Sequence, residues 1–121
     1  MAEKARIGIL ISGRGSNMAA LVYAAKAPGC PYEIVLVASN HPEAPGLTLA
    51  EAEGIATFAH PHKGLSRETH DAIMHEALVE AGVEYVVLAG YMRILSDGFV
   101  SKWTDRMLNI HPSLLPKYKG L

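Results

Sequence analysis

Short, almost wholly apolar runs are the feature that most constrains the fold of this 121-residue chain. Three of them read RIGILI at 6–11, EIVLVA at 33–38 and YVVLA at 85–89, and shorter candidates occupy 56–59 and 107–110. Apolar runs without polar alternation are typical of strands that are covered on both faces, as in parallel sheets. The sequence therefore predicts a parallel sheet with helices on both of its faces.

Helical patterns separate the apolar runs, at 16–26, 47–53, 67–81 and 96–103. Ser66 stands where a helix N-cap is expected, and Gly54 and Gly82 stand where a helix would end in a left-handed residue. Strands that alternate with helices imply right-handed crossovers and an open α/β sheet. Because neither a repeat nor a linker interrupts the pattern, residues 1–121 are expected to form one domain.

Composition narrows the classes of partner. The formal net charge is −1 and only 19% of the residues are charged, which gives no reason to expect nucleic acid or an anionic membrane as partner. Cys30 is the only cysteine, so no intrachain disulfide or cysteine-based metal cluster can form. The first residues do not read as a signal peptide, and no apolar run approaches the roughly 20 residues of a membrane span. These features predict a cytoplasmic protein.

A glycine-rich loop, Ser-Gly-Arg-Gly-Ser-Asn at 12–17, follows the first predicted strand and opens the first predicted helix. Glycines permit close approach of a ligand, and the N–H groups at a helix start favour a phosphate. The loop matches neither the dinucleotide fingerprint, because Met18 occupies the third glycine position, nor the phosphate loop of nucleotide hydrolases. The residues alone leave two readings open, a monophosphate site or a tight turn without ligand.

Asn109 and His111 end the last predicted strand, and residues two apart on a strand point to the same face. An amide N–H can stabilise the oxyanion of a tetrahedral intermediate, and an imidazole can move the proton of an attacking amine. The pair therefore suits acyl transfer to an amine. The alternative is a pair of structural side chains, although asparagine is a poor strand former.

Other candidates are weaker. His60 and His62 flank Pro61 in a predicted loop, and His70 and His75 are badly spaced for one helical face, so we expect surface histidines and no metal site. Arg67 and Arg93 could each contact an anionic ligand or be an ordinary solvated or ion-paired arginine, and Trp103 is expected in a core or an interface.

Asn-Ile-His-Pro-Ser-Leu-Leu-Pro at 109–116 resembles the signature of folate-dependent formyltransferases. Three further segments resemble the branch of that family that acts on glycinamide ribonucleotide. They are Ile-Ser-Gly-Arg-Gly-Ser-Asn at 11–17, Ser39-Asn40 followed by Ala-Pro-Gly-Leu at 44–47, and Val-Leu-Ala-Gly-Tyr-Met-Arg-Ile-Leu at 87–95. The resemblance runs essentially from end to end and implies a Rossmann-like fold.

The resemblance also implies a role for each site residue. Gly15, Ser16 and Asn17 would hold the phosphate of glycinamide ribonucleotide. Asn109 would polarise the formyl carbonyl and contact folate, His111 would transfer the proton, and Pro112 would line the substrate channel. The 10-formyltetrahydrofolate co-substrate would lie against Arg67, Met92, Arg93, Ile94 and Leu95, without a metal. The implied partners are these small molecules, in de novo purine synthesis, and a homodimer is left open.

Family members continue beyond a segment like 117–121 and supply an aspartate that pairs with the histidine. The resemblance therefore implies a longer native protein and an inactive product if the polypeptide ends at Leu121. Two alternative functions stay open, hydrolysis of formyltetrahydrofolate and phosphosugar binding without turnover. The branch that formylates transfer RNA carries an additional nucleic-acid-binding domain and lacks this glycine loop.

Overall fold

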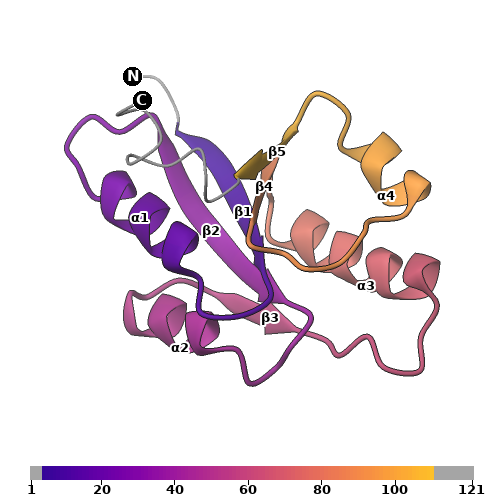
Figure 1. The fold of residues 1–121 in the computed structure, drawn as a ribbon. Coiled ribbons are helices and arrows are strands. Elements are labelled where there is room, and N and C mark those ends of the chain that lie inside the picture. The colour runs from indigo at the N-terminus through magenta and orange to yellow at the C-terminus, as the bar shows by residue number, and fades with distance from the viewer. Residues whose placement is uncertain (1–3, 111–121) are drawn as a thin grey trace, which may run out of the picture.

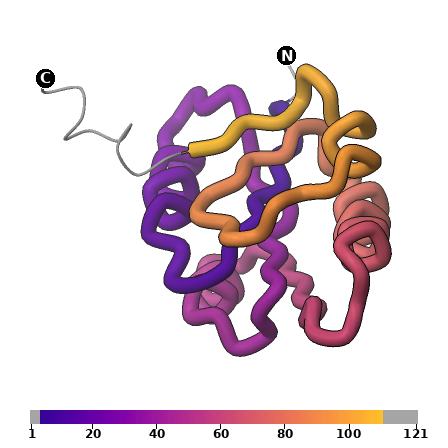
Figure 2. Tube along the Cα trace, turned by 45° about the vertical axis from the view of Figure 1, so that its right-hand side comes forward, coloured from indigo at the N-terminus to yellow at the C-terminus, as the bar shows by residue number. Residues whose placement is uncertain are grey.

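Five parallel strands form a single sheet in the computed structural model, which describes residues 4–110 (Figure 1). The sheet order is β3-β2-β1-β4-β5. The strands are β1 (Ala5–Ile11), β2 (Tyr32–Ser39), β3 (Thr57–Ala59), β4 (Tyr85–Ala89) and β5 (Met107–Ile110). In the turned view of Figure 2, the yellow β5 lies along the edge of the sheet beside β4. The predicted open parallel α/β sheet is thereby confirmed.

The helices cover both faces of the sheet, as expected. One face packs against α1 (Ser16–Ala25) and α2 (Pro45–Ala52), and the other packs against α3 (Arg67–Glu80) and α4 (Asp97–Lys102). Each face has its own core cluster. Ile9, Ile11 and Val37 face the first pair of helices, whereas Leu10, Ala38 and Val86 face the second. The alternation along β1 explains why the strand carries no polar residue from Ile7 to Ile11.

The helix ends follow the predicted signals. The Ser66 hydroxyl accepts a hydrogen bond from the backbone N–H of Thr69 at 3.1 Å and so caps α3. Gly54 and Gly82 adopt the left-handed conformation, with φ of 79° and 77°. The one notable shift is in α2, which begins at Pro45 rather than at Leu47, because proline fits the first turn of a helix.

The strand order reverses at β1, which is therefore a topological switch point. The strands β2 and β3 follow on one side of β1, and β4 and β5 lie on its other side. In open α/β sheets the crevice at such a switch point, outside the carboxyl ends of the strands, is where ligands bind. The loops that follow β1 and β4 therefore face one another across this crevice.

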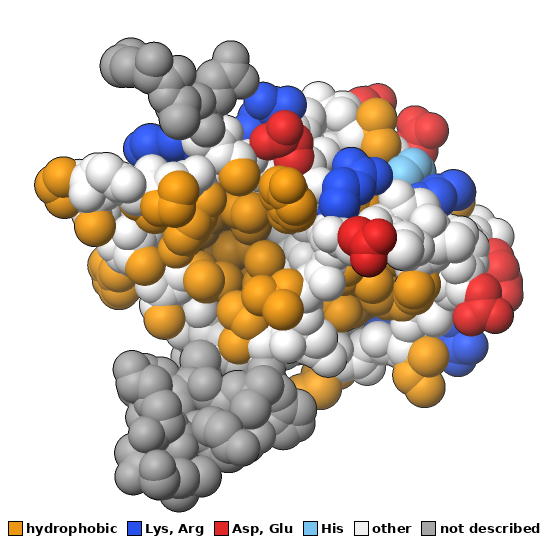
Figure 3. Space-filling view, turned by 90° about the horizontal axis from the view of Figure 1, so that it is seen from above, with side chains coloured by type: hydrophobic (Ala, Val, Ile, Leu, Met, Phe, Trp, Pro, Cys, Tyr) orange, Lys and Arg blue, Asp and Glu red, His pale blue; other side chains and the backbone are white. Residues whose placement is uncertain are grey.

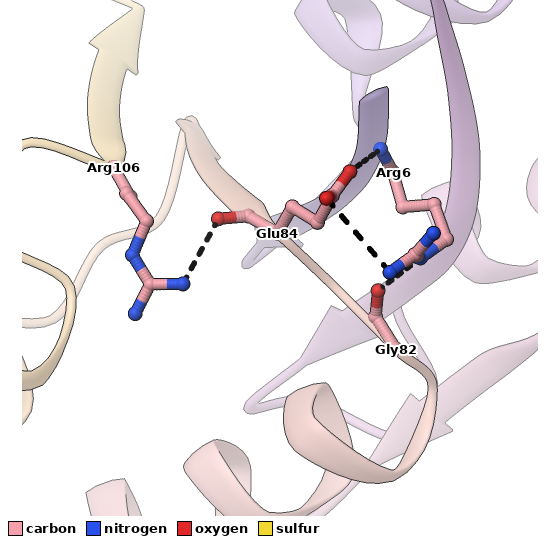
Figure 4. Close-up of polar contacts among 4 residues, drawn as sticks. All are labelled: Arg6, Gly82, Glu84 and Arg106. Atoms are coloured by element: carbon pink, nitrogen blue, oxygen red, sulfur yellow. Dashed lines mark hydrogen bonds and ion pairs between the residues drawn. The ribbon is translucent and has the colours of Figure 1, made fainter. Parts of the chain in front are cut away.

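Polar contacts tie the amino ends of the strands together, at the opposite end of the sheet from the crevice (Figure 4). The Arg6 Nε donates to the carbonyl of Gly82 at 2.6 Å, and the Arg6 backbone N–H donates to the Glu84 carboxylate at 2.9 Å. A guanidinium N–H of Arg106 reaches the Glu84 carbonyl at 3.5 Å. Together these contacts connect the end of α3 to β1, and they stabilise the fold at a distance from the ligand crevice.

Hydrophobic side chains gather around a hollow on the face shown in Figure 3. At the amino ends of β1, β4 and β5, residues such as Ile7, Tyr85 and Met107 line a cavity of about 370 Å³. The side chain of Leu108 on β5 is also exposed. None of the helices within residues 4–110 combines the length and the apolar character needed to cross a bilayer.

Candidate functional site

A cavity of about 420 Å³ occupies the crevice at the switch point. One wall is the glycine loop after β1, and the other is the segment after β4. The lining residues are Ser12, Gly13, Arg14, Gly15, Ser16, Asn17, His41, Ala89, Gly90 and Met92. The fold thus brings the predicted phosphate-binding residues and the predicted folate-binding residue Met92 to one cavity, although Asn17 and Met92 are 75 positions apart in the sequence.

The start of α1 is open to an anion. Gly15 precedes the helix in the left-handed conformation, with φ of 73°, and no side chain within residues 4–110 caps the helix. The first turn carries no acidic residue, and Ser16 is exposed. The uncapped N–H groups and the positive end of the helix dipole therefore favour a negatively charged ligand in the cavity. This local structure suits a phosphate better than a plain turn.

Gly46 of α2 is a site residue that sequence reasoning missed. Its backbone N–H donates to the carbonyl of Gly13 at 3.1 Å, so that the start of α2 supports the glycine loop from behind. A Cβ at this position would lie 2.9 Å from the Arg14 carbonyl oxygen and would clash with Ile11. The sequence signal, a Pro-Gly pair before a helix, indicated only a helix start.

A buried hydrogen-bond chain connects the two walls of the cavity. The backbone N–H of Met92 donates to the Ser12 hydroxyl at 2.7 Å, and that hydroxyl donates to the Asn40 side-chain oxygen at 2.8 Å. The Asn40 amide nitrogen lies 3.2 Å from Nδ1 of His62. Ser12 and Asn40 are both buried. The chain fixes the position of Met92 relative to the glycine loop.

The predicted folate segment, 92–95, presents its side chains in two ways. Met92 and Ile94 are 80% and 74% exposed, which leaves two large apolar side chains free to contact a ligand. Leu95 packs partly against the core beneath α3 and α4. Arg93 is half-buried, and its Nε makes no hydrogen bond within the described residues. Arg67, at the start of α3, is exposed. An apolar surface beside a donor that has no partner within the described residues suits a flat ring with polar edges.

The histidines are not all at the surface, and the prediction for His70 is wrong. Its side chain is fully buried on α3, and its Nε2 lies 2.7 Å from the carbonyl oxygen of His60. That hydrogen bond satisfies one ring nitrogen, which is why a histidine is tolerated there. Burial lowers the pKa of His70, and the nearby Arg93 lowers it further. The pKa of His62 is lowered by the same two causes.

The four histidines that lie near one another do not form a metal centre. Ring centroids of His41 and His62 are 5.6 Å apart, and those of His60 and His62 are 6.0 Å and 6.1 Å from that of His70. Although these rings are close, no three His, Cys, Asp or Glu side chains within residues 4–110 are arranged to hold a metal ion.

Asn109 lies at the carboxyl end of β5, in register with Leu88 of β4, and it is exposed. It follows Met107 on the sheet face that packs against α3 and α4, whereas Ile110 packs against the opposite core. Asn109 therefore stands one strand beyond the cavity lining, next to the strand that carries the folate segment. His111 and Pro112, which complete the predicted catalytic motif, lie outside the described residues.

Comparison with known proteins agrees with this geometry. The family model described as Formyl transferase matches residues 5–121. The chain belongs to the formyl transferase family. Its match extends through both walls of the cavity and through the Asn-x-His motif at 109–111.

Several relatives of this formyl transferase chain carry more specific names. The phosphoribosylglycinamide formyltransferase of Escherichia coli K12 is 48% identical over 117 residues, which cover 95% of this chain and 55% of that protein. The trifunctional purine biosynthetic protein adenosine-3 of Gallus gallus is 48% identical over 119 residues, covering 98% of this chain and 12% of the relative.

Solved structures give the same picture. The phosphoribosylglycinamide formyltransferase of Brucella melitensis superposes with a TM-score of 0.88 at 50% identity, covering 98% of this chain and 62% of that one. The formyl transferase chain thus spans slightly more than half of its single-activity relatives and a small part of the trifunctional one.

Proposed function

We propose that this chain carries the substrate-binding crevice of a phosphoribosylglycinamide formyltransferase. The enzyme would transfer a formyl group from 10-formyltetrahydrofolate to the amine of glycinamide ribonucleotide, in de novo purine synthesis. The proposal rests on one cavity that both segments line. The start of α1, with no side-chain cap among the described residues, forms one wall, and the Met92 segment forms the other. Two ligands that meet in one crevice, an anion on one wall and an apolar-faced ring on the other, are what this transfer needs.

The phosphate of glycinamide ribonucleotide is assigned to the first wall. Gly15, Ser16 and Asn17 line the cavity at the first turn of α1, where the backbone N–H groups have no capping side chain in the described part of the chain. A monophosphate is favoured over a dinucleotide, because the chain at this turn has Met18 where the dinucleotide fingerprint has glycine. The sugar and the glycinamide amine would then extend from this turn toward β4 and β5.

The folate co-substrate is assigned to the second wall. Met92 and Ile94 expose apolar side chains, and the backbone of 92–95 makes no backbone–backbone hydrogen bond with the rest of the described chain. Apart from the Met92 N–H, which donates to Ser12, its backbone polar groups are therefore free within residues 4–110 to pair with a pterin edge. Arg67 and Arg93 add positive charge for the anionic part of the folate.

The chemistry is assigned to Asn109 and His111. The amine nitrogen attacks the formyl carbon, and the Asn109 amide donates a hydrogen bond to the carbonyl oxygen as it becomes negative. His111 accepts the proton that the amine loses and returns a proton to N10 of the folate as its bond to the formyl carbon breaks. The products are the formylated ribonucleotide and tetrahydrofolate. Pro112 would line the channel between the two substrates.

An assay of the full polypeptide separates this proposal from its two alternatives. Release of tetrahydrofolate is followed by absorbance, with and without glycinamide ribonucleotide. The proposal predicts that release requires the ribonucleotide and matches its formylation mole for mole. Release at an equal rate without ribonucleotide would identify a hydrolase. Calorimetric binding of ribonucleotide without any release would identify a binding module.

Three further expectations accompany the proposal. A polypeptide that ends at Leu121 should show no turnover in the same assay. We also propose a cytoplasmic location and small-molecule partners only, without nucleic acid or membrane. A homodimer stays a prediction that sedimentation of the full polypeptide tests.

A further inference from the structure

Asp71 is a buried carboxylate that the proposed reaction does not use. It lies in the second turn of α3 and is only 2% exposed. One of its oxygens accepts a hydrogen bond from the backbone N–H of Ser96 at 2.6 Å. The other, Oδ1, has no hydrogen-bond partner among the described residues. A buried carboxyl group with an oxygen that lacks a hydrogen-bond partner is costly, so its retention calls for a role.

The carboxylate of Asp71 holds the residue that follows the folate segment. Ser96 is that residue, and it is itself buried as the N-cap of α4. Tyr91 precedes the segment, and its buried hydroxyl also lacks a partner within residues 4–110. Because neither this hydroxyl nor Asp71 Oδ1 is hydrogen-bonded, the two groups do not bond to one another, and Asp71 holds the segment through the Ser96 N–H.

The folate segment has few other constraints on its shape. Residues 91–95 form neither helix nor strand, and within the described chain they make no backbone–backbone hydrogen bond. The Ser12 hydroxyl holds Met92 from the side of β1. On the side of α3, the Asp71 carboxylate accepts a hydrogen bond from Ser96, the residue that follows the segment. One side chain of α3 thus fixes the end of an irregular segment.

We propose that Asp71 is a positioning residue for the folate co-substrate, which sets the shape of the segment 92–95 through its hydrogen bond from the Ser96 N–H. This inference rests on the proposed function. Asp71 does not touch the reacting atoms. It fixes the backbone groups that would pair with the pterin, so that less free energy is lost in ordering them when folate binds. Loss of the carboxylate should weaken folate binding and leave the phosphate wall unchanged, because that wall is built on β1, α1 and α2.

The test compares Asp71→Ala with Glu80→Ala in the full polypeptide. Glu80 is an exposed acidic residue near the end of the same helix and serves as the matched control. Three quantities are measured: the dissociation constant for tetrahydrofolate by titration, the KM for each substrate, and hydrogen exchange of the amides at 91–96. Asp71→Ala should weaken tetrahydrofolate binding at least about tenfold, the usual size for a lost hydrogen bond to a charged group. The KM for glycinamide ribonucleotide should stay within about twofold.

Hydrogen exchange distinguishes failure of this inference from failure of the proposed function. If the parent protein neither binds tetrahydrofolate nor transfers a formyl group, the proposed function fails. Faster hydrogen exchange at 91–96 in Asp71→Ala would in that case still show that Asp71 restrains the segment. If the parent is active and Asp71→Ala leaves folate affinity unchanged, or raises both KM values equally, the positioning role is wrong.

A second variant keeps the test informative if Asp71→Ala does not fold. Asp71→Asn keeps a side-chain oxygen that can accept the Ser96 N–H but removes the carboxylate. It should weaken tetrahydrofolate binding by about threefold or more, because a hydrogen bond to a neutral acceptor is weaker than one to a charged group. Unchanged binding together with unchanged hydrogen exchange at 91–96 in Asp71→Asn would overturn the proposal.

Discussion

The Ser12 hydroxyl accepts a hydrogen bond from the backbone N–H of Met92 at 2.7 Å, although 80 positions separate the two residues. The same hydroxyl donates to Asn40, so a single small side chain joins the carboxyl ends of β1, β2 and β4. This bond places the predicted folate segment against the predicted phosphate loop. We therefore expect the distance between the two proposed substrates to depend on Ser12.

Replacement Ser12→Ala should lower the free energy of unfolding by about 1–3 kcal/mol, because it leaves the Met92 N–H and the Asn40 oxygen without their partner in a buried place. The KM for the folate co-substrate should rise, since Met92 loses its anchor. Urea denaturation and steady-state kinetics measure both effects. Ser101→Ala, at an exposed serine of α4, is the control and should change neither quantity.

Replacement Gly46→Ala should affect the opposite wall. The new methyl group would lie 2.9 Å from the Arg14 carbonyl oxygen, so the glycine loop must shift. We expect the KM for glycinamide ribonucleotide to rise more than that for the folate, and stability to fall by about 1–3 kcal/mol through overpacking. Gly98→Ala, where a methyl group meets only ordinary contacts, is the matched control. Equal changes in both KM values would contradict the assignment of this wall to phosphate.

Stability should depend on pH through His70. Burial lowers its folded-state pKa below the ordinary 6.5, so the unfolded chain binds the proton more readily. The free energy of unfolding therefore falls as pH drops below 6.5 toward the folded-state pKa, and it levels off below that value. His70→Gln, which keeps an N–H for the His60 carbonyl, should flatten the profile measured by urea denaturation between about pH 7.5 and about pH 5.

Part of this pH dependence belongs to other histidines. The pKa values of His62 and His75 are also lowered, with burial as the main cause, so His70→Gln should reduce the slope without removing it. A profile identical to that of the parent would show that His70 does not titrate differently on folding.

Sequence reasoning predicted the sheet and its helices well because their signals are local. The apolar run at 6–11 and the cap at Ser66 each depend on neighbouring residues only, and both predictions are confirmed. The burial of His70 and Asp71 could not be predicted, since it depends on partners in His60 and Ser96. From sequence alone, a polar residue early in a helix is expected at the surface, because the partner that permits its burial comes from a distant part of the chain.

The site predictions also succeeded where the signal is local and failed where it depends on distant contacts. The glycine loop and the segment after β4 could be predicted to share an edge, because carboxyl ends of parallel strands meet there. The supporting role of Gly46 could not, because a close approach between two loops leaves no trace in sequence spacing. The roles of Asn109 and His111 stay predictions, since no ligand contact tests the first and the second lies outside the described residues.

The central claim is that Asn109 stabilises the oxyanion during formyl transfer to glycinamide ribonucleotide. The direct measurement is kcat for Asn109→Ala in the full polypeptide, with Leu108→Ala, an exposed neighbour on the same strand, as the control. Loss of an oxyanion donor predicts that kcat falls on the order of 100-fold to 1,000-fold while the control stays within about twofold. A kcat for Asn109→Ala within about threefold of the parent value would contradict the account.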